Sequence, residues 1–179
     1  YEQIIFLSGM INDLATLSRA ERGKLTTEIE AINAHDVLQD LKQAYQRQAE
    51  EKGLKLTIKA DPHLELLRSS KLYVKEILQN FVTNAIKYTQ AGSIEISKQK
   101  KIGGVRFDVT DTGIGISKTD KQKVFDKFFR SEDYRTRQSS GTGLGLYVTM
   151  KLARLIHAEV DLQSEVNEGS TFSVYFPNL

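Results

Sequence analysis

The segment EILQNFVTNAIKY, residues 76–88, lies at the end of a predicted helix that spans residues 71–88. Side chains three and four positions apart are neighbours on a helix, so Asn80, Asn84 and Lys87 share one face. Asn is a poor helix former, and two asparagines inside a helix therefore need an explanation. A carboxamide oxygen can bind Mg²⁺ and a lysine ammonium can bind phosphate; a polar face that only contacts solvent is the alternative.

A second motif, DTGIG at residues 111–115, directly follows a predicted strand at residues 105–110. The carboxylate of Asp111 therefore lies where the backbone turns sharply, and the glycines permit close approach of a planar ligand. A buried carboxylate at this place can accept a hydrogen bond from an exocyclic amine such as that of adenine. An ordinary Asp-x-Gly turn without a ligand is the alternative.

A third motif, GTGLGL at residues 141–146, opens a predicted helix at residues 144–157. A glycine-rich turn at a helix N-terminus presents free N–H groups and the positive end of the helix dipole to phosphate. The glycine spacing differs from the dinucleotide fingerprint GxGxxG, and no β-α-β unit surrounds it. The sequence also contains no Walker A motif and no His-Arg-Asp triplet, which excludes P-loop enzymes and eukaryotic-type protein kinases.

Between the second and third motifs, about 30 residues lack a clear period, apart from a short helical stretch predicted at residues 122–129. Connections of this length in a compact domain are usually functional lids or disordered segments. Phe125, Phe128 and Phe129 have helical spacing just before Arg130, which is typical of packing. Inside a lid, the same aromatic cluster can also anchor the loop in its closed position.

The remaining pattern predicts one folded domain with an appended helix. We expect helices at residues 1–22, 36–52, 71–88 and 144–157, strands at residues 54–60, 93–98, 105–110, 160–164 and 171–176, and a linker at residues 21–33. This order predicts an α/β fold, a two-layer sandwich of a mixed β-sheet covered on one face by helices and preceded by an N-terminal helix.

Apolar side chains of the first predicted helix recur at alternating steps of three and four residues, as in a coiled-coil seam. They are Ile4, Leu7, Ile11 and Leu14. A single helix cannot bury such a face by itself, so this helix needs a partner. The partner is another helix, another chain or the body of its own domain.

The amino-acid composition of the chain excludes several classes of function. The net charge is +2 over 179 residues and basic residues are spread along the chain, so nothing points to nucleic acid. There is no cysteine, which excludes disulfides and thiolate zinc sites and is compatible with a reducing cytoplasm. No apolar run reaches the roughly 18 residues that span a bilayer. We expect a cytoplasmic fragment without membrane contact of its own.

The three motifs, the paired phenylalanines and a final EGSTF segment at residues 168–172 occur in the order of the sequence boxes of histidine kinase ATP-binding domains. The chain therefore resembles the catalytic domain of sensor histidine kinases of two-component systems. The resemblance implies the Bergerat-type sandwich shared with gyrase-like, Hsp90-like and MutL ATPases. Residues 1–33 look like the second helix of a dimerisation and phosphoacceptor hairpin plus its linker, and residues 34–179 like the catalytic ATP-binding domain.

The resemblance implies ATP and Mg²⁺ as cofactors and gives roles to particular positions. Asn84 would be the main Mg²⁺ ligand with Asn80 in support. Lys87 and Arg130 would reach the phosphates, and with Asn80 they would serve catalysis. The adenine would be surrounded by Tyr88, Asp111, Gly113, Gly115 and Thr171, with Asp111 accepting its amine. The phosphates and the end of the lid would be held by Gly141, Thr142, Gly143, Leu144 and Gly145.

One departure from the related ATPases concerns the reaction. Those relatives carry Glu, a general base for water, where this chain has Asn80. Without that carboxylate the activation of water is poorly supported. Transfer of the γ-phosphoryl group to a protein histidine is favoured, because a neutral imidazole needs little deprotonation to attack phosphorus. An ATP-hydrolysing relative, a nucleotide-binding regulatory module without catalysis and a serine-directed kinase remain as alternatives.

The phosphoacceptor is expected outside these residues. His35, His63 and His157 all lack the family's acceptor pattern and are interpreted as structural. We therefore expect the acceptor histidine on a hairpin helix that precedes Tyr1. The resemblance further implies a homodimer in the full-length protein, a response regulator receiver domain as partner, and the option of a membrane anchor elsewhere in the full-length protein.

Overall fold

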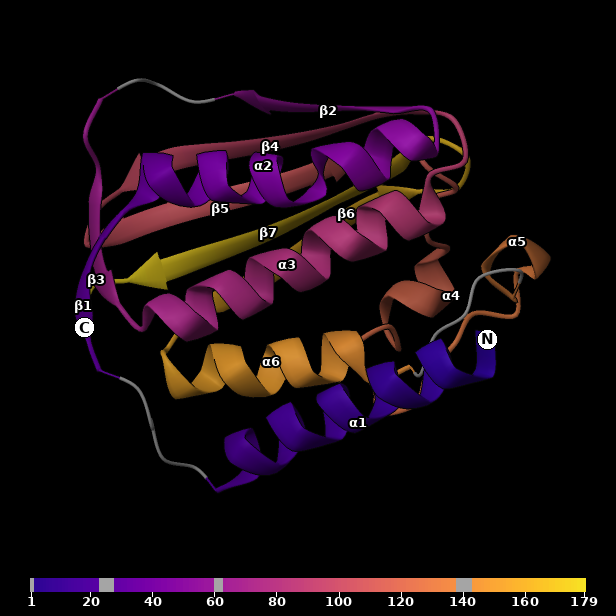
Figure 1. The fold of residues 1–179 in the computed structure, drawn as a ribbon, viewed down its shortest axis with the longest axis horizontal. Coiled ribbons are helices and arrows are strands. Elements are labelled where there is room, and N and C mark those ends of the chain that lie inside the picture. Colours follow the sequence, from indigo (N-terminus) through magenta and orange to yellow (C-terminus); the bar gives the residue numbers. More distant parts are fainter. Residues whose placement is uncertain (1, 23–27, 60–62, 138–142) are drawn as a thin grey trace.

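The computed structural model describes residues 2–22, 28–59, 63–137 and 143–179, which form a layer of helices on a β-sheet (Figure 1). In chain order the elements are α1 (Glu2–Glu21), β1 (Glu30–Asn33), α2 (Ala34–Glu51), β2 (Leu54–Lys59), β3 (Leu66–Ser69), α3 (Lys71–Tyr88), β4 (Gly92–Lys101), β5 (Gly104–Asp111), α4 (Lys118–Lys121), α5 (Tyr134–Arg137), α6 (Gly145–Leu155), β6 (Glu159–Glu165) and β7 (Gly169–Pro177).

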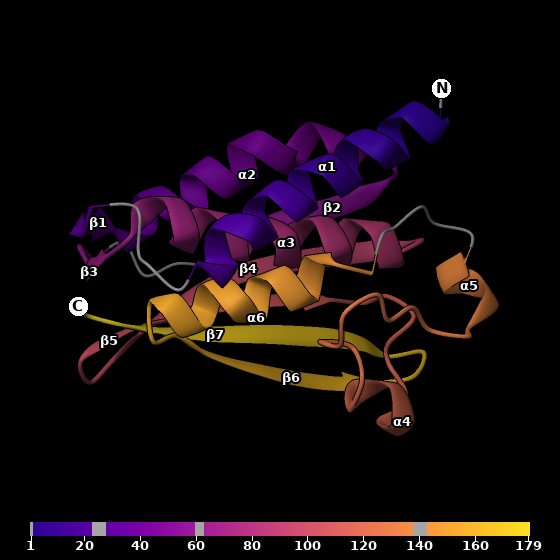
Figure 2. The ribbon, with the colours of Figure 1, turned by 90° about the horizontal axis from the view of Figure 1, so that it is seen from below.

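The main sheet contains five strands in the order β2-β4-β5-β7-β6. β2 pairs in parallel with β4, and the other neighbours pair antiparallel, so the sheet is mixed. α2, α3 and α6 cover one face of the sheet (Figure 2), and α1 lies alongside α6. The predicted two-layer sandwich with an N-terminal helix is confirmed.

The core lies between this helix layer and the sheet. α3 contributes Ile77, Leu78 and Phe81, which are fully buried. From the sheet, Phe107 of β5 and Phe176 of β7 meet edge to face with ring centroids 5.7 Å apart. Burial of apolar area is the main favourable contribution to folding. This packing therefore fixes the polar face of α3 relative to the ends of β5 and β7.

Capping interactions set the ends of the helices around the core. The side chain of Ser70 accepts a hydrogen bond from the amide of Tyr73 at the start of α3. At the other end of α3, the Lys52 ammonium donates to the carbonyls of Ile86 and Lys87 at 2.7 and 2.9 Å. The last carbonyls of a helix lack partners within the helix. Lys52 thus holds the end of α3 from the C-cap position of α2.

Two local predictions are corrected by the structure, and two short elements were not predicted. Residues 30–33 are not linker but form β1, which pairs antiparallel with β3, a strand that was not predicted. The helix expected at residues 122–129 is replaced by turns, and the helical segment is α4, at residues 118–121. α5 was also not predicted. Each of these elements is only four residues long, too short to show a period of its own.

Within the residues that the structure describes, no helix has both the length and the apolar character that crossing a bilayer requires. Gly141 and Thr142, which belong to the third motif, lie outside the described residues.

Candidate functional site

Asp111 is the last residue of β5, where the register places it opposite Ser170 of β7. Its Oδ1 accepts hydrogen bonds from the amides of Gly113 at 2.9 Å and Ser170 at 3.3 Å. The side chain is only 7% exposed. Burial raises the pKa of Asp111 above its ordinary value, while the two amides oppose this rise. The carboxyl group is therefore held in one orientation by backbone donors.

The two glycines that follow Asp111 are required by close backbone contacts. A Cβ on Gly113 would lie 2.4 Å from the carbonyl oxygen of Tyr88. Gly115 has φ +71°, and a Cβ there would lie 1.9 Å from the carbonyl oxygen of Glu165. Only glycine fits such positions without moving the backbone. The turn after β5 is thus fixed against the end of α3 on one side and the end of β6 on the other.

A cavity opens beside this turn, and Asp111 lines it. Its apolar walls are formed by Ile114, Ile116, Val124, Phe129, Leu146 and Phe172, and its polar lining includes Asn84, Tyr88 and Arg130. A mostly apolar pocket with a few fixed polar groups is the usual form of a site for a small, flat organic ligand. We call this compartment the base pocket.

A second compartment adjoins the base pocket, and the two share Asn84, Tyr88 and Arg130. The second compartment also contains Asn80 and Lys87, so the polar face of α3 predicted from the sequence does line a cavity. Gly143 and Gly145, the described glycines of the third motif, line it too. We call this compartment the polar pocket.

Asn80 is fixed by contacts with the start of α6. Its Nδ2 donates to Thr149 Oγ1 at 3.0 Å and lies 3.4 Å from the carbonyl oxygen of Gly145. Thr149 in turn donates to the same carbonyl at 3.0 Å. Because the amide nitrogen faces α6, the role of Asn80 includes joining α3 to the glycine turn. Asn84 lies one turn later and lines both compartments.

Positive charge gathers in the polar pocket. Burial lowers the pKa of Lys87, the nearby Arg130 guanidinium lowers it further, and Asp13 of α1 acts in the opposite direction. The Lys87 ammonium lies 5.4 Å from the centroid of the Tyr88 ring. Burial raises the pKa of Tyr88, and Arg130 partly offsets this rise. Two cations held close together form a receptor for an anionic group such as phosphate.

The glycine motif contributes backbone shape to the polar pocket. Gly143 has φ +74°, and a Cβ there would lie 2.6 Å from the backbone carbon of Phe128. Its carbonyl accepts a hydrogen bond from the Phe128 amide at 2.9 Å. Leu144 is fully buried and is not among the residues that line either compartment. Its place in the core indicates a packing role, in contrast to the ligand contact predicted for it.

Thr171 does not line the base pocket either. Its hydroxyl lies 3.0 Å from that of Thr110, whereas its neighbours Ser170 and Phe172 line the pocket. Successive side chains of a strand point to opposite faces of the sheet. Thr171 therefore projects from the face opposite the helices, and a contact with the base is not supported.

The three phenylalanines of the predicted lid, Phe125, Phe128 and Phe129, do not all lie on the side of the pocket. Phe125 packs edge to face on Phe172 with centroids 6.3 Å apart, and Phe172 stacks on Phe81 of α3 at 5.2 Å. Phe129 lines both compartments. Phe128, by contrast, has φ +63° and is 55% exposed. The turn conformation therefore separates three side chains that a helix would have placed on one face.

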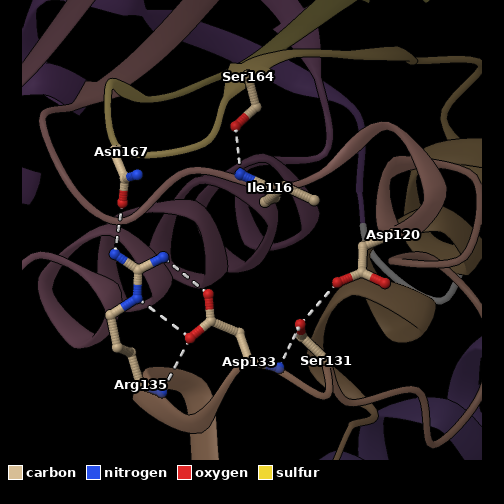
Figure 3. A network of polar contacts seen from close by, with 7 residues as sticks. All are labelled: Ile116, Asp120, Ser131, Asp133, Arg135, Ser164 and Asn167. Carbon is tan, nitrogen blue, oxygen red and sulfur yellow. Dashed lines mark hydrogen bonds and ion pairs between the residues drawn. The ribbon is translucent and has the colours of Figure 1, made fainter.

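A network of polar contacts ties the lid to the turn between β6 and β7 (Figure 3). Arg135 donates to Asp133 at 2.8 Å and to Asn167 Oδ1 at 2.6 Å. Ser131 donates to Asp120 Oδ2 at 2.6 Å, and Asp120 also lines the base pocket. Sequence motifs did not reveal these contacts, because the residues follow no period and the contact between Arg135 and Asn167 joins positions 32 residues apart.

The fold is that of solved histidine kinases. The structure of full-length ShkA in complex with AMPPNP superposes with a TM-score of 0.85 at 24% identity, over 97% of this chain and 36% of that one. The histidine kinase AdeS of Acinetobacter baumannii has a TM-score of 0.79 at 22% identity, over 98% of this chain and 80% of that one.

Comparison of the sequence with known families shows the family to which this chain belongs. The family model described as histidine kinase-, DNA gyrase B-, and HSP90-like ATPase matches residues 70–179, and the chain belongs to this family. Among relatives, the autoinducer 2 sensor kinase/phosphatase LuxQ of Vibrio vulnificus is 32% identical over 178 residues. That match covers 96% of this chain but 21% of LuxQ, so the chain spans about a fifth of the length of this relative. The predicted resemblance is confirmed.

Proposed function

We propose that this chain is the ATP-binding catalytic domain of a protein-histidine kinase in two-component signal transduction. It would transfer the γ-phosphoryl group of Mg-ATP to a histidine on a dimerisation helix. The observation that supports the proposal is that two compartments adjoin. Asp111 lines the base pocket, and Lys87 and Arg130 line the polar pocket. Together they match the flat base and the charged phosphates of one nucleotide.

In the base pocket, Asp111 would accept a hydrogen bond from the adenine amine. Its orientation is already set by the amides of Gly113 and Ser170, so little rearrangement is needed on binding. Tyr88 and Gly115 line the same pocket and would lie against the base. The fold neighbour ShkA was solved with AMPPNP, an ATP analogue, and this supports ATP as the ligand.

In the polar pocket, Asn84 would bind Mg²⁺ through its carboxamide oxygen. Mg²⁺ usually keeps several waters and takes few protein ligands when it is bound together with phosphates. The polar pocket offers a donor set of this kind, because Asn84 supplies a neutral oxygen in the same compartment as the two cations that would meet the phosphates. Asn80 would support the metal site indirectly, because its amide group is bound to α6. Lys87 and Arg130 would neutralise phosphate charge.

Transfer is a better proposal than hydrolysis because residue 80 is an asparagine, which cannot act as a base toward water. Catalysis would then rest on positioning and charge neutralisation. An ATP-hydrolysing relative within the same family is the second candidate, since the family model covers such enzymes too. A binding module without catalysis and a serine-directed kinase are further alternatives.

The three histidines of this chain are poorly placed to accept phosphate. His35 lies in the first turn of α2. That end of α2 lies beside the two-stranded sheet of β1 and β3 (Figure 1). His157 follows α6, whose start lines the polar pocket, and ten residues of helix correspond to roughly 15 Å. His63 is exposed and precedes β3. The acceptor would therefore be a histidine outside these residues.

Residues 1–33 would be the second helix of the dimerisation hairpin plus its linker, and residues 34–179 the catalytic domain. The exposed seam of α1 supports this division, because Ile4, Leu7 and Ile11 are 66%, 55% and 65% exposed. A homodimer and a response regulator receiver domain as partners would follow from the same proposal. LuxQ, a sensor kinase/phosphatase by name, supports the signalling role.

Phosphate release from the isolated chain separates the first two candidates. A kinase domain without its acceptor should bind Mg-ATP, as seen by isothermal titration, and release phosphate only slowly. Brisk release of phosphate by the chain alone would favour the ATP-hydrolysing candidate. Absence of any ATP binding would contradict both.

A further inference from the structure

α1 is attached to the domain by its C-terminal half. Leu17 and Ala20 are buried, at 4% and 5% exposure. The Arg19 guanidinium lies 3.6 Å from the carboxylate of Glu76 in α3. Contacts between α1 and α6 accompany these interactions. The direction of the helix is therefore fixed by its second half, and this determines where its first half lies.

The first half of α1, by which we mean the segment up to Asp13, residues 2–13, lies over the polar pocket. Four of its residues line that pocket together with the polar face of α3: Ile5, Phe6, Gly9 and Asp13. The space between them measures about 310 Å³, far above the volume that one water molecule needs. α1 thus forms one wall of the compartment proposed to hold the phosphates without filling it.

Asp13 differs in the sign of its charge from the other charged residues that line the polar pocket. Among the described residues that line the polar pocket it is the sole carboxylate, and the two cations there are Lys87 and Arg130. The electrostatic effect of Asp13 on Lys87 is attractive: it raises the pKa of Lys87, against the lowering by burial and by Arg130. The carboxylate therefore acts on the cation that a phosphate group would meet.

We propose that Asp13 takes the place of a phosphate anion beside Lys87 and Arg130 when no nucleotide is bound, so that docking of the first half of α1 competes with binding of the nucleotide phosphates. The inference rests on the proposed function, because it concerns the same pocket. A triphosphate brings several negative charges into the compartment, and a fixed carboxylate there repels them. The repulsion is relieved when the first half of α1 moves away.

Competition of this kind is reciprocal. If docking of α1 weakens binding of the phosphates, binding of the phosphates weakens docking of α1 by the same factor. The position of α1 would then depend on whether a nucleotide is bound. A partner that contacts the exposed apolar residues of α1 would be affected by this difference. None of the α1 residues whose side chains the structure describes lines the base pocket, so adenosine, which lacks phosphates, should not take part in the coupling.

The first test replaces Asp13 by asparagine, which keeps the shape and removes the charge. Asp13→Asn should bind Mg-ATP about 5 to 20 times more tightly than the parent chain, as measured by isothermal titration, and adenosine equally well. Glu21→Gln is the matched control, because it removes one carboxylate from the exposed end of α1 and should leave both affinities unchanged. Unchanged Mg-ATP affinity in Asp13→Asn would overturn the proposal.

Weaker binding of Mg-ATP by Asp13→Asn would overturn it as well, since Asp13 would then act as a ligand of the metal. If the parent chain bound adenosine but gained nothing from the phosphates, the proposed function itself would fail. The two failures are therefore distinguishable: in the first, the phosphates still raise the affinity of the parent chain for Mg-ATP above that for adenosine, whereas in the second they do not.

The second test measures the position of α1 directly. The chain has no cysteine, so Ser8→Cys on α1 and Gln90→Cys after α3, both exposed, can carry a pair of spin labels. Saturating Mg-ATP should shift or broaden the measured distance in the otherwise unchanged chain, and adenosine should not. Asp13→Asn should already show the altered distance without nucleotide. Identical distances in all these states would contradict the competition.

Discussion

The two halves of the cavity are built by different means. The Asp111 end of the base pocket depends on backbone: a strand register, two amides that hold Asp111, and glycines packed against carbonyl groups. Lid side chains such as Val124 and Phe129 line the rest of this pocket. The polar pocket depends on side chains that come from α1, α3, the lid and the start of α6. Backbone contacts with a sheet are hard to displace, whereas charged side chains on separate segments can move apart. Recognition of the base should therefore be rigid, and handling of the phosphates adjustable.

The strongest test of the rigid half is Gly115→Ala. The new Cβ would lie 1.9 Å from the Glu165 carbonyl oxygen at φ +71°, so the backbone must shift. We expect a loss of at least about 2 kcal/mol in the free energy of unfolding and loss of adenosine binding. Gly145→Ala is the control, because nothing lies within 4 Å of its Cβ. Thermal unfolding in which the two variants are equally stable would contradict this account of the base pocket.

In the polar pocket, the largest effect is expected at Asn84, the proposed metal ligand. Asn84→Ala should weaken Mg²⁺-dependent ATP binding more than Asn80→Ala does, because a direct ligand is lost instead of its support. Asn80→Ala should instead lower the stability of the fold by about 1 kcal/mol, since it removes the hydrogen bond to Thr149. Isothermal titration and chemical unfolding separate the two effects. If Asn84→Ala bound Mg-ATP as tightly as the parent chain, the metal assignment would be wrong.

Asp111→Asn tests base recognition without disturbing shape. An amide can donate where a carboxylate only accepts, so ATP binding should weaken by roughly 1–3 kcal/mol. The parent chain should bind GTP poorly, because guanine has a carbonyl oxygen where adenine has its exocyclic amine, and a carboxylate cannot accept a hydrogen bond from a carbonyl group. Competition titrations with ATP and GTP decide the point. Equal affinities of the parent chain for the two nucleotides would remove Asp111 from its proposed role.

The smallest effect is expected at the contact between the lid and the β6–β7 turn. Arg135→Ala removes the hydrogen bond to Asn167 and should favour lid opening by less than about 1 kcal/mol. Hydrogen exchange of residues 117–137 without nucleotide should be fast in the parent chain and faster in the variant. Arg47→Ala is the control, because its ion pair with Glu51 is exposed and lies in α2. Slow exchange throughout this span would contradict a lid.

The same contrast explains what the sequence could predict. Asp111, Gly113 and Gly115 form a local motif at the end of a strand, and the structure confirms the turn that the motif predicted. Residues 71–88 were predicted as a helix, and α3 has the same bounds. Thr171 was misplaced because order along a motif does not reveal which face of the sheet a side chain takes.

Several features of the structure were beyond such reasoning. Asp13 enters the polar pocket through the packing of a helix whose sequence shows only an apolar seam. Asn167 contacts the lid residue Arg135 across 32 positions in the chain. β1 and β3 pair with each other over four residues each, so their stability comes from tertiary contacts and not from a local pattern. Sequence patterns describe single elements, and these features arise between elements.

This chain is proposed to hold the nucleotide half of a phosphotransfer to histidine. The direct measurement is incubation with γ-labelled ATP and Mg²⁺, alone and together with a hairpin fragment that carries the acceptor helix from the parent gene. We expect acid-labile, base-stable label on the hairpin fragment and none on the chain alone. Label on His35, His63 or His157 in the chain alone, or no transfer to the hairpin while ATP is bound, would contradict the account.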